Sequence, residues 1–461
     1  MTTERRVRVL ADASPRLARL VLSAWLSSLL AAPAAGQQMS LEEAVGIALR
    51  DNPDARVAAE RIGEAEARLG EATSAFYPRV DGRIGFARTD NPALAFSMIL
   101  NQRRFNSNLD FNDPGATQNV RPELVGAWPI FRGGQDYLRR QAAALGVEAA
   151  RLERLAVRNA LTEAVSAAYY ALVAAPQYQA AAQASVRAVG AALQQTRTRH
   201  QAGTALRADV LSLEARLAEA RAAELRAGNA VALARTGLRT LLALPADHEL
   251  EIGASVDAGG PPLPAELDEA LARAAAGRPE LAAATRQVTM RERELGAERA
   301  AWLPKIDLVG GYANDSDNFQ LTHENDSWLF GAAAEINVFD GFRIREKVRA
   351  AEHQLAAARE VERRTRLEIA REAEDAFLSY GEARQRAAVG DAGLSAADAA
   401  LGLVEEQYAA GAASVTRYLE AEAARAAARS RAVAARYDER RAAAALQKAI
   451  GAWADEEDLV P

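Results

Sequence analysis

The chain has 461 residues, a formal net charge of −6 at pH 7 and no cysteine. This length allows two or three domains, and the absence of cysteine excludes disulfides and Cys-ligated metals. The acidic balance gives no reason to expect nucleic acid as a partner. The four histidines are scattered without a metal-binding spacing, so neither a metal site nor a cofactor is expected.

The N-terminus, residues 1–36, is typical of an export signal. Five arginines between residues 5 and 19 precede an apolar core from Leu20 to Ala32. Cleavage is expected within residues 32–34 or 34–36, and the alternative is an uncleaved N-terminal anchor. No later segment holds 18 uninterrupted apolar residues, so no transmembrane helix is expected after the signal. Such a chain would enter a membrane only as a β-barrel.

From residue 37 onward the sequence repeats itself. Pro78 and Pro304 lie 226 positions apart within similar motifs, whereas Gly203 and Gly411 lie 208 apart. A period above 200 residues is too long for a solenoid, so two domain-sized copies are expected. The predicted organisation is a first repeat at 37–244, a linker at 245–266, a second repeat at 267–451 and a polar tail at 452–461.

Each copy is predicted to run in the same order: short helix, helix, strand, loop, strand, very long helix, turn, long helix. Ser40 and Glu43 form a capping-box pattern at the first helix, and Pro53 suits the first turn of the second helix. The change of offset implies 18 extra residues in the first copy. Insertions are tolerated in exposed loops, so residues 88–120 are predicted to be a surface loop.

Two β-hairpins are predicted, at 79–131 and 305–339, because apolar and polar residues alternate there. Strands of about 9–11 residues suit an outer-membrane barrel, whereas the alternative is a pair of soluble hairpins packed on helices. Four strands per chain cannot close a barrel, because about eight are needed. A barrel would therefore be shared between chains, and three chains would supply twelve strands.

The longest helical pattern runs from Gly134 to about His200, which at ~1.5 Å per residue is about 100 Å. A kink or break is expected at Pro176 and near Gly381 in the second copy. Each very long helix should pair with the next one as an antiparallel helical hairpin, with tips near residues 203 and 411. The alternative is a cytosolic coiled-coil spacer. The predicted fold class is therefore mainly α, a duplicated unit whose long coiled-coil helices form an α-barrel beside a small shared trimeric β-barrel.

No catalytic pattern is present: the sequence lacks a nucleophile elbow, a Walker A loop and a dinucleotide fingerprint. Its many acidic residues lie beside arginines on helical faces, which is typical of solvated surfaces. We expect no catalytic residue and no enzyme activity.

The ordered set of motifs resembles the outer membrane efflux protein family, the TolC-like channels. The resemblance covers the whole chain after the signal, in order and twice. The motifs that carry it are S-L-E-E-A at 40–44, N-P at 52–53, Y-P-R-V-D at 77–81, W-P-I-F-R-G-G at 128–134, H-Q-A-G-T at 200–204, D-V-L-S-L-E-A at 209–215, R-P-E-L at 278–281, L-P-K-I-D at 303–307, F-D-G at 339–341 and Q-Y-A-A-G at 407–411.

The resemblance implies a homotrimer in the outer membrane of a Gram-negative bacterium, extending into the periplasm. Its implied role is the exit duct of a tripartite efflux pump or type I secretion system. The implied partners are outer-membrane lipid, a periplasmic adaptor (membrane fusion) protein and an inner-membrane transporter of the RND or ABC type. A periplasmic coiled-coil adaptor or scaffold is the alternative function, although adaptors have one helical hairpin and this chain has two.

The resemblance also implies an adaptor-docking tip at the turns between the long helices. The residues concerned are Gly203 and Thr204 in the first copy and Gly411 and Ala412 in the second.

A gate is implied at the same end. Relatives hold the tip closed partly by a Tyr–Asp contact, whose positions here are Tyr408 and Asp209. The alternative is that Asp209 stabilises the start of its helix while Tyr408 packs within its hairpin. Relatives also carry an acidic ring at positions that are Arg417 and Glu420 here. We therefore expect a mixed ring, the alternative being two solvated helix charges.

Overall fold

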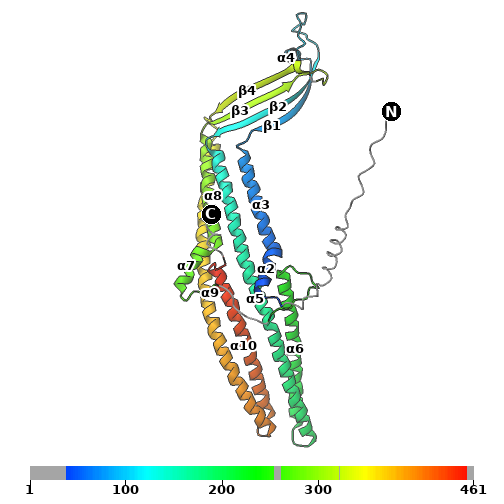
Figure 1. Cartoon of the computed structure of the whole chain (residues 1–461), viewed down its shortest axis with the longest axis vertical. Helices are drawn as coiled ribbons and strands as arrows, with labels where there is room; N and C mark the ends of the chain where they lie inside the picture. The colour runs from blue at the N-terminus through cyan, green and yellow to red at the C-terminus, as the bar shows by residue number, and fades with distance from the viewer. Residues whose placement is uncertain (1–37, 254–260, 321, 454–461) are drawn as a thin grey trace, which may run out of the picture.

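A computed structural model describes residues 38–253, 261–320 and 322–453. The predicted signal at 1–36 lies outside the described residues, as do parts of the predicted linker and tail. The described chain is elongated, with a β-sheet at one end and long helices running away from it (Figure 1).

The first half begins with two helices whose starts follow from local chemistry. Ser40 and Glu43 form the predicted capping box, with backbone-to-side-chain distances of 2.9 and 3.1 Å. Asn52 caps the next helix by accepting from the amide of Asp54, with Pro53 at the first helical position. The elements are α2 (Leu41–Asp51), α3 (Pro53–Ser74), β1 (Arg79–Thr89), α4 (Pro92–Asn101), β2 (Thr117–Arg132), α5 (Gln135–Gln201) and α6 (Arg207–Leu241).

Among its described residues, the second half follows the same order but has no counterpart of α4. Both very long helices have 67 residues, and both helices that return from the tips have 35. The elements are α7 (Leu267–Gly277), α8 (Pro279–Arg299), β3 (Lys305–Asn314), β4 (Asp326–Glu335), α9 (Arg343–Ala409) and α10 (Val415–Ala449).

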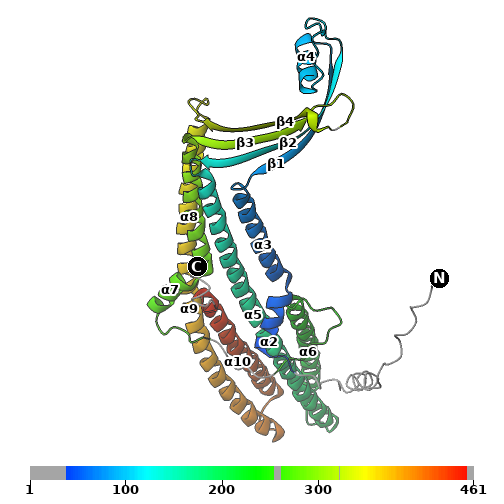
Figure 2. The same ribbon diagram turned by 45° about the horizontal axis from the view of Figure 1, so that its top comes forward.

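The four strands form one antiparallel sheet in the order β1-β2-β3-β4 (Figure 2). The two hairpins are therefore joined, because β2 pairs with β3 as well as with β1. One irregularity of register falls between Pro129 and Phe131. The return strand of the second hairpin ends at Glu335, so Ile336 and Val338, which the alternation placed in it, lie beyond the strand.

The sheet has two unlike faces, because successive side chains alternate and partners across strands share a side. One face, the apolar face, carries Val80, Ile84, Phe86, Leu124, Trp128, Leu308, Tyr312, Trp328 and Phe330. The other, the polar face, carries Asp81, Arg83, Arg121, Glu123, Lys305, Asp307, Leu329 and Glu335.

The predicted surface loop at 88–120 is shorter than expected, because β1 extends to Thr89 and β2 begins at Thr117. It is also partly ordered by α4, where Ala95 and Ile99 are buried. The buried Gln102 side chain donates to the backbone of Gln118 at 2.8 Å. The segment between β1 and β2 is thus tied back onto the sheet rather than extending freely.

The long helices run unbroken through Pro176 and Gly381, so no break occurs there, whereas the alternative of a kink stays a prediction. In α5, packing explains the continuity, since the four residues before Pro176 are all buried. By length and composition one described helix, α9, is apolar enough to cross a membrane, although no such helix was expected.

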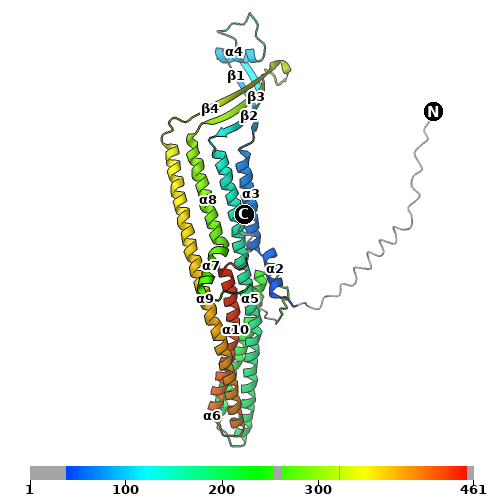
Figure 3. The same ribbon diagram turned by 60° about the vertical axis from the view of Figure 1, so that its left-hand side comes forward.

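Within one chain the helices form an open layer rather than a closed bundle (Figure 3). Near the sheet α5 packs between α3 and α8, and α8 packs between α5 and α9. Toward the tips α5 packs against α6 and α10, and α10 also packs against α9. Consequently α9 forms one edge of the layer along its whole length, whereas α3 and α6 form the other.

Candidate functional site

The two helical hairpins end in the same turn, at the end of the molecule opposite the sheet (Figure 1). Gly203 and Gly411 both have φ 78°, a left-handed conformation that glycine adopts without a steric penalty. The amides of the glycines and of Thr204 and Ala412 bond back to the preceding turn at 2.8–3.1 Å. This is a Schellman motif, which ends a helix sharply and leaves the four predicted tip residues exposed.

A shared apolar cluster joins the hairpins just above these turns. It contains buried residues from both copies, so the hairpins pack as one unit in a single chain. The buried members are Val189, Ala192, Leu193, Leu213, Leu401, Val404, Tyr408, Val415 and Tyr418.

Tyr408 lies in this cluster and is 5% exposed. Its ring stacks on Tyr418 with centroids 5.1 Å apart, and its hydroxyl shares a hydrogen bond with Thr196 of the first hairpin. Arg199 lies over the same ring at 5.3 Å and donates to the Tyr408 and Ala409 carbonyls at 3.1 and 2.7 Å. Tyr408 therefore connects the two hairpins through Thr196 and Arg199.

Tyr418 stays a neutral phenol at any physiological pH. Its burial, reinforced by the nearby carboxylates of Glu405 and Glu422, raises the pKa of Tyr418 to about 12. Its hydroxyl donates to the Ala188 carbonyl at 3.3 Å, which adds a third link between the hairpins.

Asp209 has a different role in the single chain. Its carboxylate accepts from the backbone amide of Leu206 at 3.3 Å, at the start of α6. This bond fits the helix-start alternative, and the negative charge also suits the helix N-terminus. Among the described residues no hydrogen bond joins Asp209 to Tyr408, so the Tyr–Asp gate stays a prediction.

The remaining gate residues, Arg417 and Glu420, lie exposed on the first turns of α10. Arg417 uses its backbone amide to bond Ser414, the N-cap of that helix, at 3.2 Å. Neither side chain forms an ion pair within the described part of the chain. The structure leaves both side chains free for contacts with other copies or with solvent.

Comparison with known proteins identifies this architecture. The outer membrane efflux protein family model matches residues 44–244 and 270–452, one match on each half of the chain. The chain belongs to the outer membrane efflux protein family. That family consists of channel and transport proteins of the outer membrane rather than enzymes.

Relatives and solved structures agree with this membership. CyaE of Bordetella pertussis is 28% identical over 321 residues, which cover 68% of this chain and 63% of CyaE. The pyoverdine export outer membrane protein OpmQ of Pseudomonas putida is 24% identical over 89% of this chain and 85% of its own. The Campylobacter jejuni CmeC outer membrane channel matches with a TM-score of 0.80 and 18% identity, covering 92% of this chain and 91% of that chain.

Inspection of the sequence missed a buried ionic contact in the same two hairpins of this efflux-family chain, farther from the tips. Glu422 on α10 is 1% exposed, accepts from the Ser185 hydroxyl at 2.5 Å and lies 3.4 Å from the Arg216 guanidinium. Its repeat counterpart Glu214 is half exposed and pairs with Arg197 at 2.6 Å. The sequence repeat linked the two glutamates, but only the fold shows that one of them is buried between the hairpins.

Proposed function

We propose that three copies of this chain assemble into a continuous exit duct, a β-barrel in the outer membrane followed by a helical tube in the periplasm. The observation that carries the proposal is that the sheet and the helical layer are open at the same two edges. β1 and β4 each have one unpaired side, and α9 and α3 with α6 stand at the matching edges of the helical layer.

Open strand edges are unfavourable in lipid, because their unpaired amides and carbonyls find no water there. The apolar face of the sheet makes lipid its natural environment, with Ile84, Trp328 and Phe330 all at least 70% exposed in the single chain. Pairing β4 of one copy with β1 of the next satisfies both edges at once. Twelve strands then close a barrel, and the α9 edge of each copy meets the α3 and α6 edge of its neighbour.

The tip of the tube is proposed to dock a periplasmic adaptor, which links it to an inner-membrane transporter of the RND or ABC type. The exposed turns at Gly203, Thr204, Gly411 and Ala412 support this role, because small residues on two sharp turns allow close approach. The relatives support the general role, since OpmQ is described as a pyoverdine export protein.

The gate is proposed to lie at the same tip and to involve Tyr408, Asp209, Arg417 and Glu420. Closing the ring brings the exposed α10 charges of three copies around one axis, which supports an aperture lined by both signs of charge. A few hydrogen bonds between hairpins, each worth about 1 kcal/mol, would bias such an aperture toward closure and still allow an adaptor to open it.

The duct is tested with the purified protein after export from a Gram-negative host. We expect a mass of three chains in detergent, a lower gel mobility without heating than after boiling, and ionic current across a planar bilayer. A stable monomer that carries no current would contradict the proposal. A protein recovered from the soluble periplasmic fraction would instead favour the adaptor alternative.

A further inference from the structure

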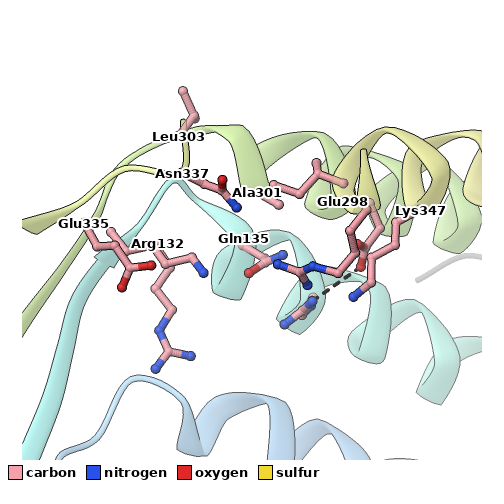
Figure 4. A pocket seen from close by; sticks show the side chains of 12 residues that line it. Arg132, Gln135, Glu298, Ala301, Leu303, Glu335, Asn337 and Lys347 are labelled. Carbon is pink, nitrogen blue, oxygen red and sulfur yellow. Dashed lines mark hydrogen bonds and ion pairs between the residues drawn. The ribbon is translucent and has the colours of Figure 1, made fainter. Parts of the chain in front are cut away.

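A cavity of about 310 Å³ lies where the sheet meets the long helices (Figure 4). Its lining is strongly cationic, with five basic side chains against two acidic ones. Figure 4 shows Arg132 from the end of β2 and Lys347 from the start of α9 on either side of Gln135. The basic residues are Arg132, Arg139, Lys305, Arg343 and Lys347, and the acidic ones are Glu298 and Glu335.

Two of these cations lie where their mutual repulsion destabilises the fold. Arg132 and Lys305 are direct partners across β2 and β3, and like charges in that position repel. Glu335 is the partner of Lys305 on the other side, but no ion pair forms between them. Lys305 and Lys347 have no ion-pair partner within the described part of the chain. The positive charges of these two lysines are therefore the uncompensated ones in the cavity, since the three arginines each lie within 4 Å of a carboxylate.

The backbone adds to the positive potential. Both 67-residue helices, α5 and α9, begin at this cavity, and neither N-cap residue supplies a side-chain cap. Helix N-termini carry partial positive charge and free amides, which favour anions. Carboxylates offset part of it. Asp340 accepts from the Ile344 amide at 3.1 Å and lies 3.6 Å from Arg343, Asp136 lies 3.9 Å from Arg132, and Glu298 lies 3.4 Å from Arg139.

Successive side chains on a strand point to opposite faces of the sheet, and this decides whether the cavity lies on the polar face or on the apolar face. Lys305 and Glu335 belong to the polar face, together with Asp307. Leu308 and Phe330 belong to the opposite, apolar face. If the apolar face contacts lipid, the cavity opens to the lumen at the base of the barrel and does not contact lipid headgroups.

We infer that this cavity is a lumenal binding site for small multivalent anions bearing phosphate or carboxylate groups, repeated three times around the duct. The inference rests on the proposed function, because it requires the polar face to line a channel. The site would concentrate anionic cargo where the helical tube meets the barrel. Clustered cations raise the local concentration of anions in this way, and the effect weakens with salt.

The test uses inorganic tripolyphosphate as the probe on the purified full-length protein. Its binding is measured by calorimetry in detergent and by block of KCl current when it is added on the barrel side of a bilayer. In Lys305→Gln/Lys347→Gln we expect the dissociation and half-blocking concentrations to rise by about tenfold or more, since charge-assisted bonds are lost. Among the described residues neither lysine forms an ion pair, so this change removes the partner of no described carboxylate.

Two matched variants separate charge from folding. Lys305→Arg/Lys347→Arg should keep wild-type binding, and Arg226→Gln/Arg384→Gln, which removes two exposed charges elsewhere, should also keep it. Equal binding and block by the wild type and the Lys-to-Gln double variant would overturn the inference. A wild-type protein that binds tripolyphosphate but carries no current would contradict the duct and leave the anion site supported.

Discussion

The two very long helices, α5 and α9, have the same length and the same place in the repeat, yet they are buried very differently. In the single chain α5 has 21 buried residues and α9 only nine, so α5 is an interior helix and α9 an edge helix. The difference teaches that two helices of equal length can hold different places in one chain: α5 lies inside the helical layer, and α9 lies at its open edge. The strands repeat this contrast, because β2 and β3 are paired on both sides while β1 and β4 are not.

The edge helix carries apolar side chains that the described part of its own chain leaves exposed. Leu367, Leu378 and Val389 are 58–71% exposed and lie 11 residues apart, close to three turns, so they share one face of α9. In a soluble monomer such a stripe would be an aggregation hazard. In the proposed trimer it is the part of α9 that a neighbouring copy covers.

The largest effect is expected from a charge on the apolar face of the sheet. Phe330→Arg should cost about 2–4 kcal/mol of barrel stability, because an arginine near mid-membrane must leave water. The matched control is Leu329→Arg, which is equally exposed in the chain (68% against 70%) but lies on the polar face. Trimer yield on unheated gels should fall only for Phe330→Arg. Equal yields would show that the two faces are assigned wrongly.

The seam on α9 is expected to be the next most sensitive place. Leu378→Arg removes a side chain whose burial by a neighbour is worth about 1.5–3 kcal/mol, and it adds a charge to the contact. The control, Gln354→Arg, adds the same charge to an exposed position of α9 on another face. Size-exclusion chromatography in detergent should show dissociation for Leu378→Arg alone. A fully trimeric Leu378→Arg protein would contradict a seam at this stripe.

The buried contact between Glu422 and Arg216 tests how much the packing of the two hairpins contributes to stability. Glu422→Gln should destabilise the protein by about 1–3 kcal/mol, because Arg216 loses its buried counter-charge. Glu420→Gln, two residues earlier and exposed, should change stability by less than about 0.5 kcal/mol. Thermal unfolding of the trimer measures both. If the two variants unfold alike, the buried contact is not what holds the hairpins together.

The gate is the smallest expected effect, and the structure sharpens its test. Tyr408→Phe and Thr196→Val both remove the hydrogen bond seen between the hairpins, whereas Asp209→Asn leaves it in place. If the Tyr–Asp contact forms in the trimer, Tyr408→Phe and Asp209→Asn should raise single-channel conductance alike, and the double variant should add little. If Thr196 is the real partner, Thr196→Val should match Tyr408→Phe while Asp209→Asn has no effect on conductance.

Much of the fold could be predicted from the sequence, because its signals are local or repeated. The capping box at Ser40, the proline at the start of α3 and the glycine turns at 203 and 411 each fix a helix end by short-range chemistry. The alternation in the strands gave the two faces of the sheet. The continuity of α5 through Pro176 could not be predicted, since packing of the preceding turn outweighs the lost hydrogen bond.

The contacts near the tips were harder to predict, because they depend on packing between distant parts of the chain. Tip glycines are visible in a sequence because their backbone conformation requires them, whereas partners across hairpins are not. Arg199, Thr196 and Glu422 look like ordinary helical polar residues until the second hairpin is placed beside the first. The cationic cavity likewise joins five side chains from three separate regions of the chain.

The central claim is that the open edges of one chain close on those of the next, and cross-linking tests it most directly. The chain has no cysteine, so Val80→Cys or Gly82→Cys on β1 can be combined with Ala332→Cys or Ala334→Cys on β4. All four positions lie on the apolar face, near the helical end of the sheet. We predict that oxidation of at least one pairing gives covalent dimers and trimers and stops there, because a ring of three has no free edge. Exclusively monomeric products from every pairing, or a ladder continuing beyond three chains, would contradict the account.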